Sequence, residues 1–407
     1  MRLGQFPEAE NFLLDAENMA RNYKDLPGLA EMFMVRCGLC IAKGDFDGAV
    51  NYLSESVQIG NELNLKEQMA LGLTHIANTQ IYMTRFEEAW KTAQEARKIT
   101  EEVGNQEHLA EILTYSVPLY HLRNGNIVEA RNAVEEGMLI ATQIGALFPK
   151  CYGAFTLGLL AGMAGRYEEA ISYQELFLEV SREGNFVFFE AMPLCILGSL
   201  YLEISRKYLD RTLKLHNEAL KLLENPAGMM GGGICWVEIG FCYLTVGDLE
   251  QAKQYFEQGL NTPTPQMLLL QPRYLVGLAL VALGQANLDE AESFVHQARH
   301  FIEERAMRDH YPLVELTEGQ VKASRGELQQ ALQYFTRAEE QALAMEMRPT
   351  VRKARIEAAK VLLKMGLEAE AETKFWAARE MLEEMATFFQ SEELRALYME
   401  NEPVDRN

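Results

Sequence analysis

The residues of this sequence that suggest chemistry are few and scattered. Cys37 and Cys40 form a Cys-x-x-Cys pair, a spacing found in redox and zinc sites, but no second pair follows it. His296 and His300 stand four residues apart, as two zinc ligands on one helix face would, yet the His-Glu-x-x-His arrangement is missing. We interpret the two cysteines as packing residues of a helix and the two histidines as part of a solvated helix surface.

Two further patterns have the residue types of a catalytic or phosphate site without the rest of it. The glycine run Gly231 to Gly233 lacks the Lys-Ser/Thr pair that completes a phosphate-binding loop, so it is interpreted as a hinge. Adjacent carboxylates such as Glu101/Glu102 and Glu383/Glu384 are common on solvated helices. We expect no catalytic constellation, no metal site and no cofactor, and therefore no enzyme.

Composition narrows the class of protein. Lys and Arg total 38 against 59 Asp and Glu, and the net charge of −21 argues against a nucleic-acid partner, because phosphates require a basic face. The six cysteines lie in apolar, helix-like stretches, which favours a reducing cytoplasm. The longest uncharged run of membrane-like composition, Cys151 to Gly165, has fifteen residues and is too short to cross a bilayer. We expect a soluble cytoplasmic protein with no membrane contact.

One short pattern, Gly-x-aromatic/aliphatic-x-x-Ala, recurs along the chain. Six full copies are GQFPEA at 4, GDFDGA at 44, GNIVEA at 125, GRYEEA at 165, GDLEQA at 247 and GELQQA at 326. Three relatives are TRFEEA at 84, ANLDEA at 286 and GLEAEA at 366, and one copy near 205 is degraded. A second position, small in nine of ten copies, follows seven residues after the Ala, at intervals of 39 to 42 residues: Ala16, Ser56, Ala96, Gly137, Phe177, Ala219, Gly259, Ala298, Ala338 and Ala378. Antiparallel helices approach closely only at small side chains, and Gly permits the tight turn between them.

The pattern resembles the tetratricopeptide repeat. WVEIGFCY (Trp236 to Tyr243) and LCILGSLY (Leu194 to Tyr201) fit the W-x2-L-G-x2-Y opening of that family almost fully. The period of about 40 residues exceeds the usual 34 or so, which implies helices of roughly 16 to 18 residues, about 25 Å long. The resemblance implies an all-α, right-handed superhelical α-solenoid of tandem antiparallel helix pairs.

The repeat phase predicts one continuous solenoid over residues 1–390. A half repeat (1–24) precedes nine two-helix repeats of about 40 residues, and 391–407 form a short capping helix and tail with Leu394, Leu397 and Tyr398 on one face. Gly104, Gly145 and Gly184 stand where second helices should end. Stacked layers of 8 to 10 Å would make a curved rod on the order of 80 to 100 Å long.

The first predicted helix, from Gln5 to about Tyr23, is the second helix of a unit whose first helix is absent. Solenoids need polar caps at their ends, and this helix has none. We expect it to be covered by a partner, by a second copy in a homo-dimer, or by the missing helix of a longer protein.

The first helices of four central units are almost free of charge, unlike those of the outer units. In the tetratricopeptide family these helices line the concave surface, which implies an apolar groove for a protein or peptide, in particular an amphipathic helix. The inner-facing positions would be Tyr152, Phe155, Leu159, Met192, Cys195, Leu202, Val237, Phe241, Leu244, Val276, Leu280 and Leu283. The alternative is that long helices tighten the superhelix until the chain itself covers this face.

The 40-residue unit and its turns also resemble the helical sensor region of MalT-like proteins and related large bacterial signalling ATPases. The ending SEELRALYMENEPVDRN is similar to the close of the repeat region in cyclase- or LuxR-linked ATPases. This resemblance implies the sensor or interaction region of a larger signalling regulator. A free-standing scaffold that assembles a complex through its concave groove is the alternative. A third hypothesis, chemistry hidden in the groove, has only four dispersed polar candidates: Tyr115, His121, Ser199 and Arg273.

Overall fold

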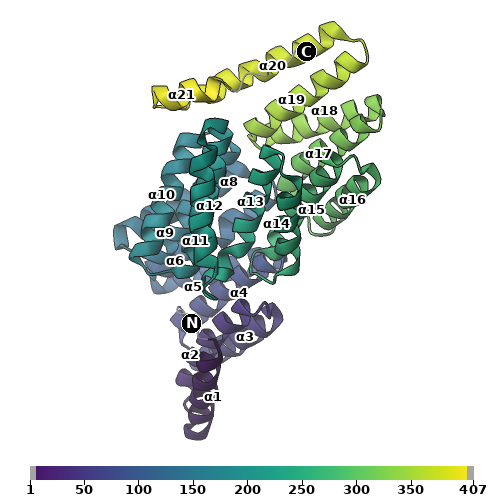
Figure 1. Cartoon of the computed structure of the whole chain (residues 1–407). Helices are drawn as coiled ribbons and strands as arrows, with labels where there is room; N and C mark the ends of the chain where they lie inside the picture. The colour runs from purple at the N-terminus through teal and green to yellow at the C-terminus, as the bar shows by residue number, and fades with distance from the viewer. Residues whose placement is uncertain (1–5, 401–407) are drawn as a thin grey trace.

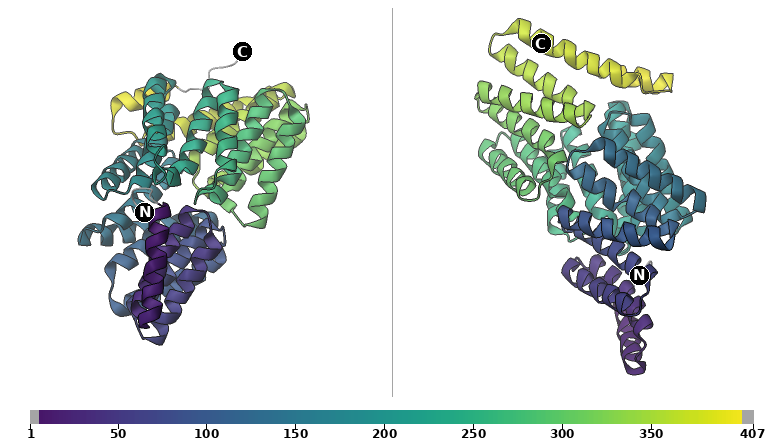
Figure 2. Two further views of the ribbon diagram at one scale, coloured as in Figure 1. Left: turned by 60° about the horizontal axis from the view of Figure 1, so that its bottom comes forward. Right: turned by 180° about the vertical axis from the view of Figure 1, so that it is seen from behind.

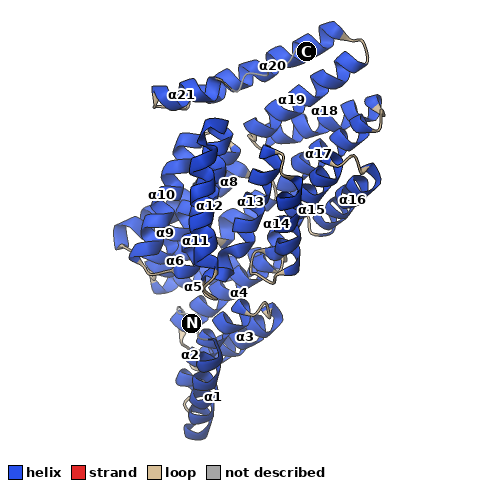
Figure 3. Ribbon diagram, viewed as in Figure 1, coloured by secondary structure: helices blue, strands red, loops and turns tan. Residues whose placement is uncertain are grey.

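The computed structural model describes residues 6–400, and nearly all of them are helical (Figure 3). This range holds 21 α-helices and three 3₁₀ turns, with no strand. Helix α1 (Phe6–Tyr23) is followed by nine pairs of antiparallel helices and by α21 (Glu392–Met399). The predicted all-α solenoid is confirmed.

Each pair has a first and a second helix, and most have 17 or 18 residues, within the expected length. The first helices are α2 (Leu26–Ala42), α4 (Lys66–Tyr82), α6 with α7 (Gln106–Thr114 and Ser116–Arg123), α9 (Leu147–Met163), α11 (Val187–Ile204), α13 (Gly232–Val246), α15 (Met267–Gly284), α17 (Tyr311–Ser324) and α19 (Arg348–Lys364). The second helices are α3 (Phe46–Glu62), α5 (Phe86–Val103), α8 (Ile127–Ile144), α10 (Tyr167–Glu183), α12 (Leu209–Leu223), α14 (Leu249–Asn261), α16 (Leu288–Glu304), α18 (Leu328–Ala344) and α20 (Glu368–Ala386). Short 3₁₀ turns precede α12, α13 and α17: η1 (Arg206–Tyr208), η2 (Gly228–Gly231) and η3 (Arg308–His310).

In eight of the nine pairs the turn contains one residue with left-handed backbone; the turn between α11 and α12 has Ser205 in extended backbone instead. Gly44 and Gly247 take φ of 76° and 86°, which a glycine adopts without steric cost. Thr84 and Ala286 replace glycine in two units and still take φ of 58°, at a cost of about 1 kcal/mol each. In these two units the turn geometry is therefore kept although the glycine is lost.

The small positions are where neighbouring helices touch. A Cβ added to Gly259 would lie 2.1 Å from Cε1 of Tyr274 on the next first helix, and one added to Gly240 would lie 2.4 Å from Cε1 of Phe256. These separations leave no room for a larger side chain. The small residues that recur every 40 residues or so therefore mark the contacts between helices, as the sequence predicted.

The first helix of the third unit is broken in two. Tyr115 separates α6 from α7 with φ −128° and ψ −74°, outside helical values. Pro118 explains the break, because it has no N–H to donate to the carbonyl of Thr114 and its ring crowds that carbonyl. Pro118 also stands where the other units place a small residue.

The units form a more tightly wound superhelix than the curved rod predicted from stacked helix layers. Helix α4 packs against α15, and α7 packs against η3, although well over a hundred residues separate the members of each pair. The superhelix therefore turns far enough for early units, coloured purple and blue, to lie beside late ones, coloured green (Figures 1 and 2). The linker Asn261 to Gln266 also contacts an early unit. A Cβ added to Gly44 would lie 3.5 Å from Cβ of Pro263.

Helix α21 lies across the fourth and fifth units (yellow in Figure 1). Tyr398 is buried with its ring 5.5 Å from that of Tyr167 and 5.2 Å from that of Phe389. The Glu168 carboxylate accepts the backbone N–H groups of Gln390, at 2.6 Å, and Ser391, at 3.2 Å. Leu394 and Leu397, predicted to share a face with Tyr398, pack half-buried against the same cluster.

Three helical segments are long and apolar enough, by length and composition, to cross a membrane: Val187–Ile204, Gly228–Val246 and Met267–Gly284. The sequence analysis missed them because it considered uncharged runs alone, and these segments contain charged residues, such as Glu190 and Glu203 in α11. Between 56% and 67% of each segment is buried inside the solenoid, so packing against other helices accounts for much of this apolar character.

Replacing Gly259 by Val should destabilise the fold, because the new side chain overlaps the Tyr274 ring. We expect the free energy of unfolding to fall by about 1–3 kcal/mol, the usual effect of overpacking. Urea unfolding followed by circular dichroism measures it. Gln258→Val, at the exposed neighbouring position, should change stability by no more than about 0.5 kcal/mol. Equal effects at both positions would contradict the assigned helix contact.

Candidate functional site

The twelve positions predicted to line a groove are all partly or fully shielded from solvent. Six are buried: Tyr152, Met192, Cys195, Leu202, Val237 and Val276. Six are half-buried: Phe155, Leu159, Phe241, Leu244, Leu280 and Leu283. None of the twelve is exposed in the structure.

These residues divide between two clusters of the core. Most belong to a large cluster that joins early units to late ones: Tyr152, Phe155, Leu159, Met192, Phe241, Val276, Leu280 and Leu283. Cys195, Val237 and Leu244 pack instead around Trp236 and Phe256, between neighbouring units. Leu202, on α11, is buried apart from both sets.

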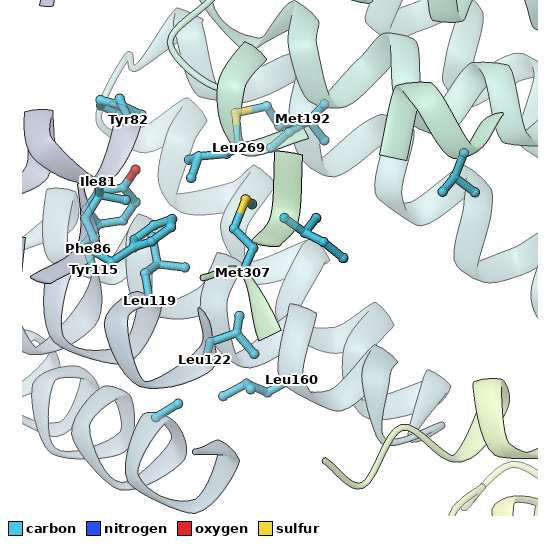
Figure 4. Close-up of a cluster of buried hydrophobic side chains, with 14 of the residues drawn as sticks. Ile81, Tyr82, Phe86, Tyr115, Leu119, Leu122, Leu160, Met192, Leu269 and Met307 are labelled. Atoms are coloured by element: carbon cyan, nitrogen blue, oxygen red, sulfur yellow. The ribbon is translucent and has the colours of Figure 1, made fainter. Parts of the chain in front are cut away.

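The large cluster is where early and late units meet. Figure 4 shows side chains of α4, α5 and α7, among them Ile81, Phe86 and Leu119, facing Met192, Leu269 and Met307 from later units. We call this contact between the early units (α4 to α7) and the later ones the seam. The chain itself covers much of the central apolar face here, and a role of the twelve residues in binding stays a prediction.

A charged set is buried at the seam. Arg123 of α7 donates through Nη1 to a carboxylate oxygen of Asp309 and, at 2.8 Å, to Nε2 of His310. All three side chains are more than nine-tenths buried. Nε of Arg123 and Oδ1 of Asp309 are buried without a partner within the described residues. Two polar atoms at the seam therefore keep unused hydrogen-bonding capacity.

His310 is neutral in this arrangement. A ring nitrogen that accepts from a guanidinium carries no proton, which places the proton on Nδ1. Burial lowers the pKa of His310 to about 4; Asp309 opposes this shift and Arg123 and Arg273 add to it. The ring therefore stays uncharged at neutral pH.

Three tyrosines of the large cluster pack against one another. The rings of Tyr82 and Tyr115 have centroids 5.9 Å apart, and those of Tyr115 and Tyr152 lie 4.3 Å apart. Burial raises the pKa of all three hydroxyls, which keeps them protonated as hydrogen-bond donors. Tyr115 and Tyr152 were among the predicted residues; Tyr82 was not.

Sequence reasoning also missed Arg123, Asp309 and His310. Asp309 stands in a strongly charged segment, EERAMRDH, and 186 residues separate it from Arg123. Nothing local to either residue indicates the pairing. The other polar groove candidates are dispersed: Arg273 pairs with Glu238 at 2.8 Å. His121 packs edge-on to Trp90, and Oγ of Ser199 is buried without a partner within the described residues.

The Cys-x-x-Cys pair and the two histidines of the sequence lie within the packed helices and on a helix surface, respectively. Burial raises the pKa of the Cys37 thiol to about 12, which disfavours the reactive thiolate. His296 and His300 are exposed on α16, beside an open depression that Asp289 and Glu292 also line. No group of three or more His, Cys, Asp or Glu suited to a metal occurs within residues 6–400.

The glycine run and the paired carboxylates are also accounted for by packing. A Cβ on Gly232 would lie 2.9 Å from the Trp236 ring, so the run allows close approach. The carboxylates are each paired with a cation: Glu101 with Arg97, Glu102 with Lys66, Glu383 with Arg379 and Glu384 with Arg348.

Comparison with protein families agrees with the repeat analysis. A family model described as tetratricopeptide repeat matches residues 235–262, which cover most of α13 and all of α14. This is the unit that begins with WVEIGFCY, the best match found in the sequence. The fold is that of a tetratricopeptide-type array. A search of curated proteins gave no significant match.

Solved structures of the same architecture are similar to the chain. A Rap protein complexed with competence and sporulation factor aligns over 88% of this chain and 99% of its own, at 10% identity and a TM-score of 0.62. At that identity the likeness concerns the fold alone. Apo RapI (15% identity, 67% and 98% coverage) and a human IFIT1 dimer with m7Gppp-AAAA (15%, 81% and 74%) each reach a TM-score of only 0.46.

Stability should depend on pH through His310. Its pKa of about 4 in the folded chain lies below the unfolded value of about 6.5, so the unfolded state takes up the proton first as pH falls. The free energy of unfolding should therefore drop by about 2 kcal/mol between pH 7 and pH 5 on account of this residue alone. Urea titrations at both pH values measure the change.

His310→Gln should remove that part of the pH dependence, whatever its effect on stability at pH 7. His121 and His216, whose pKa values burial also lowers, contribute equally in both proteins. His296→Gln, at an exposed position, should keep the wild-type dependence. An unchanged pH dependence in His310→Gln would contradict a neutral buried ring.

Proposed function

We propose that this chain is a non-catalytic array that binds a protein or peptide through its central apolar face, as the sensor or interaction region of a larger cytoplasmic signalling regulator. The observation that carries the proposal is the seam. Its lining is apolar and aromatic, five of the predicted residues there are only half-buried, and Arg123 and Asp309 keep unpartnered polar atoms.

An incoming ligand would compete with contacts that the chain makes with itself. A peptide or amphipathic helix with Leu, Met or aromatic side chains would lie against Phe155, Leu159 and Phe241 in place of side chains from the other turn. Such binding shifts the chain toward an opened superhelix by the difference in affinity for the two states. The seam is thus proposed as the element through which a ligand changes the shape of the array.

Three observations support the kind of partner and setting. The Rap protein of similar fold was solved with a bound factor, which supports a ligand-binding role for this architecture. The net charge of −21 favours a protein or peptide over a nucleic acid. All six cysteines are free, in keeping with a reducing cytoplasm.

Binding can be tested with a fluorescein-labelled amphipathic helix that carries Leu, Met and Phe on one face and equal numbers of Glu and Lys on the other. We expect saturable binding by fluorescence anisotropy, weakened at least tenfold by Phe241→Asp or Leu280→Asp with unchanged helical circular dichroism. Val246→Asp, at a 40% exposed position at the end of α13, is the matched control. Absence of saturable binding would count against the proposal. Loss of helical structure in both variants would show that Phe241 and Leu280 are core residues and not part of a binding surface.

The larger context is a separate question, for which the 40-residue period favours a regulator of the MalT-like type over a free-standing scaffold. Reading the DNA upstream of the codon for Met1 tests it. We expect an open reading frame that continues upstream and encodes a phosphate-loop ATPase. A stop codon and ribosome-binding site directly before Met1 would instead favour the scaffold.

A further inference from the structure

The C-terminal part of the described chain folds back onto units far from it in the sequence. Residues 387–400 follow α20 and include helix α21; we call them the strap. The strap leaves the last unit and lies on the fourth and fifth, where the ring of Tyr398 packs against Tyr167 of α10 (Figure 1). It therefore joins two parts of the superhelix that contacts between adjacent units do not connect.

Helix α21 depends on this contact for its own structure. It has eight residues, whereas isolated helices shorter than about 12–15 residues are marginal in water. The carboxylate of Glu168 accepts the backbone N–H groups of Gln390 and Ser391 just before the helix, where a negative charge also interacts favourably with the helix dipole. Oγ of Ser391 accepts the N–H of Leu394 in the first turn. Since Glu168 belongs to α10, docking of the strap and formation of α21 are coupled.

The strap is held by few contacts. Only two of its side chains, Phe389 and Tyr398, are buried. On α21 three more are half-buried, namely Leu394, Leu397 and Met399, and the other four residues of the helix are exposed. Glu400 pairs with Lys207 at 2.7 Å, but both side chains are more than half exposed, and such pairs contribute little. Two rings and one carboxylate cap therefore provide most of the attachment.

The strap closes the same gap as the seam. Gly125 in the third unit lies against Met345, and Gly165 in the fourth unit lies against Met385, directly before the strap. Each methionine stands 220 residues beyond its glycine, so the two contacts repeat one superhelical offset. Because the units are packed in series, separating early from late units at the seam also draws Met385 away from Gly165. The docked strap opposes that movement.

We propose that the strap is a releasable latch. Docked, it holds the superhelix closed; undocked, with α21 unfolded, it lets early and late units separate at the seam. Coupling of docking to helix formation makes release cooperative, and the small number of anchors keeps the undocked state accessible. The consequence for binding rests on the proposed function: a ligand of the opened seam binds more weakly in proportion to the fraction of molecules that the latch keeps closed.

Hydrogen exchange of the full chain, followed by mass spectrometry, tests the latch without any ligand. Tyr398→Ala should speed exchange at least tenfold in the strap and also in two seam segments of other units, 116–123 and 305–312. Glu393→Ala, at an exposed position of α21, is the matched control and should change neither. Faster exchange in the strap with unchanged exchange in both seam segments would overturn the proposal, because the strap would then be a local cap.

General loss of stability needs its own control. Gly259→Val overlaps the Tyr274 ring, far from the strap in the array, and should destabilise the chain without speeding exchange in the strap. The same exchange pattern in Gly259→Val and Tyr398→Ala would contradict a specific latch.

The carboxylate cap gives an independent variant on the other side of the contact. Glu168→Ala removes the acceptor of two strap N–H groups and should reproduce the effect of Tyr398→Ala on both strap and seam. Glu168→Gln keeps an acceptor oxygen and should have a smaller effect. Glu169→Ala, at the neighbouring position that pairs with Arg166, is the control. Unchanged exchange in Glu168→Ala would overturn the role of the cap.

The labelled amphipathic helix used to test the proposed function also tests the consequence for binding. We expect Tyr398→Ala to bind it at least threefold more tightly than the unaltered chain in fluorescence anisotropy, because more molecules are open. Equal affinities would overturn the link between latch and ligand. If neither protein binds the helix while Tyr398→Ala speeds exchange in both strap and seam, the latch is supported and the proposed function is not.

Discussion

The architecture depends on how closely two helices can approach at a small residue. Every unit but the one with Phe177 places Gly, Ala or Ser at the contact, and larger neighbours such as Tyr274 and Phe256 fill the space that those residues leave. The interaxial distance fixed there sets the small rotation from one helix pair to the next. The superhelical path follows from that rotation, repeated along the chain.

Much of the fold could be predicted because its determinants are local and periodic. The turn glycines, the small positions and the helix lengths recur within 40-residue windows, so Gly44 and Gly259 each indicate their own role. The C-terminal helix with Tyr398 was also visible as a short amphipathic segment. What the sequence could not supply is the sum of many small rotations, each too subtle to derive from residue types.

That sum decides how the candidate site is interpreted. The apolar first helices of the central units have two explanations, a groove or a face covered by the chain, and only the superhelical path distinguishes them. The path brings α7 to η3, where Arg123 finds Asp309 and His310. An isolated buried cation would be costly, so the seam supplies its counter-charge from a distant part of the chain. Long-range pairing of this kind leaves no trace in the local sequence.

The seam also affects how the chain folds. An ideal solenoid has contacts only between adjacent repeats, so its segments unfold nearly independently and its cooperativity decays along the array. Here Arg123 and Asp309 close a loop of 186 residues, and α21 ties the last unit to the fourth. Loops of that length carry an entropic cost that must be met before the contact forms, which slows folding but couples remote segments. The middle of this repeat array should therefore unfold more cooperatively than a solenoid whose contacts join adjacent repeats alone.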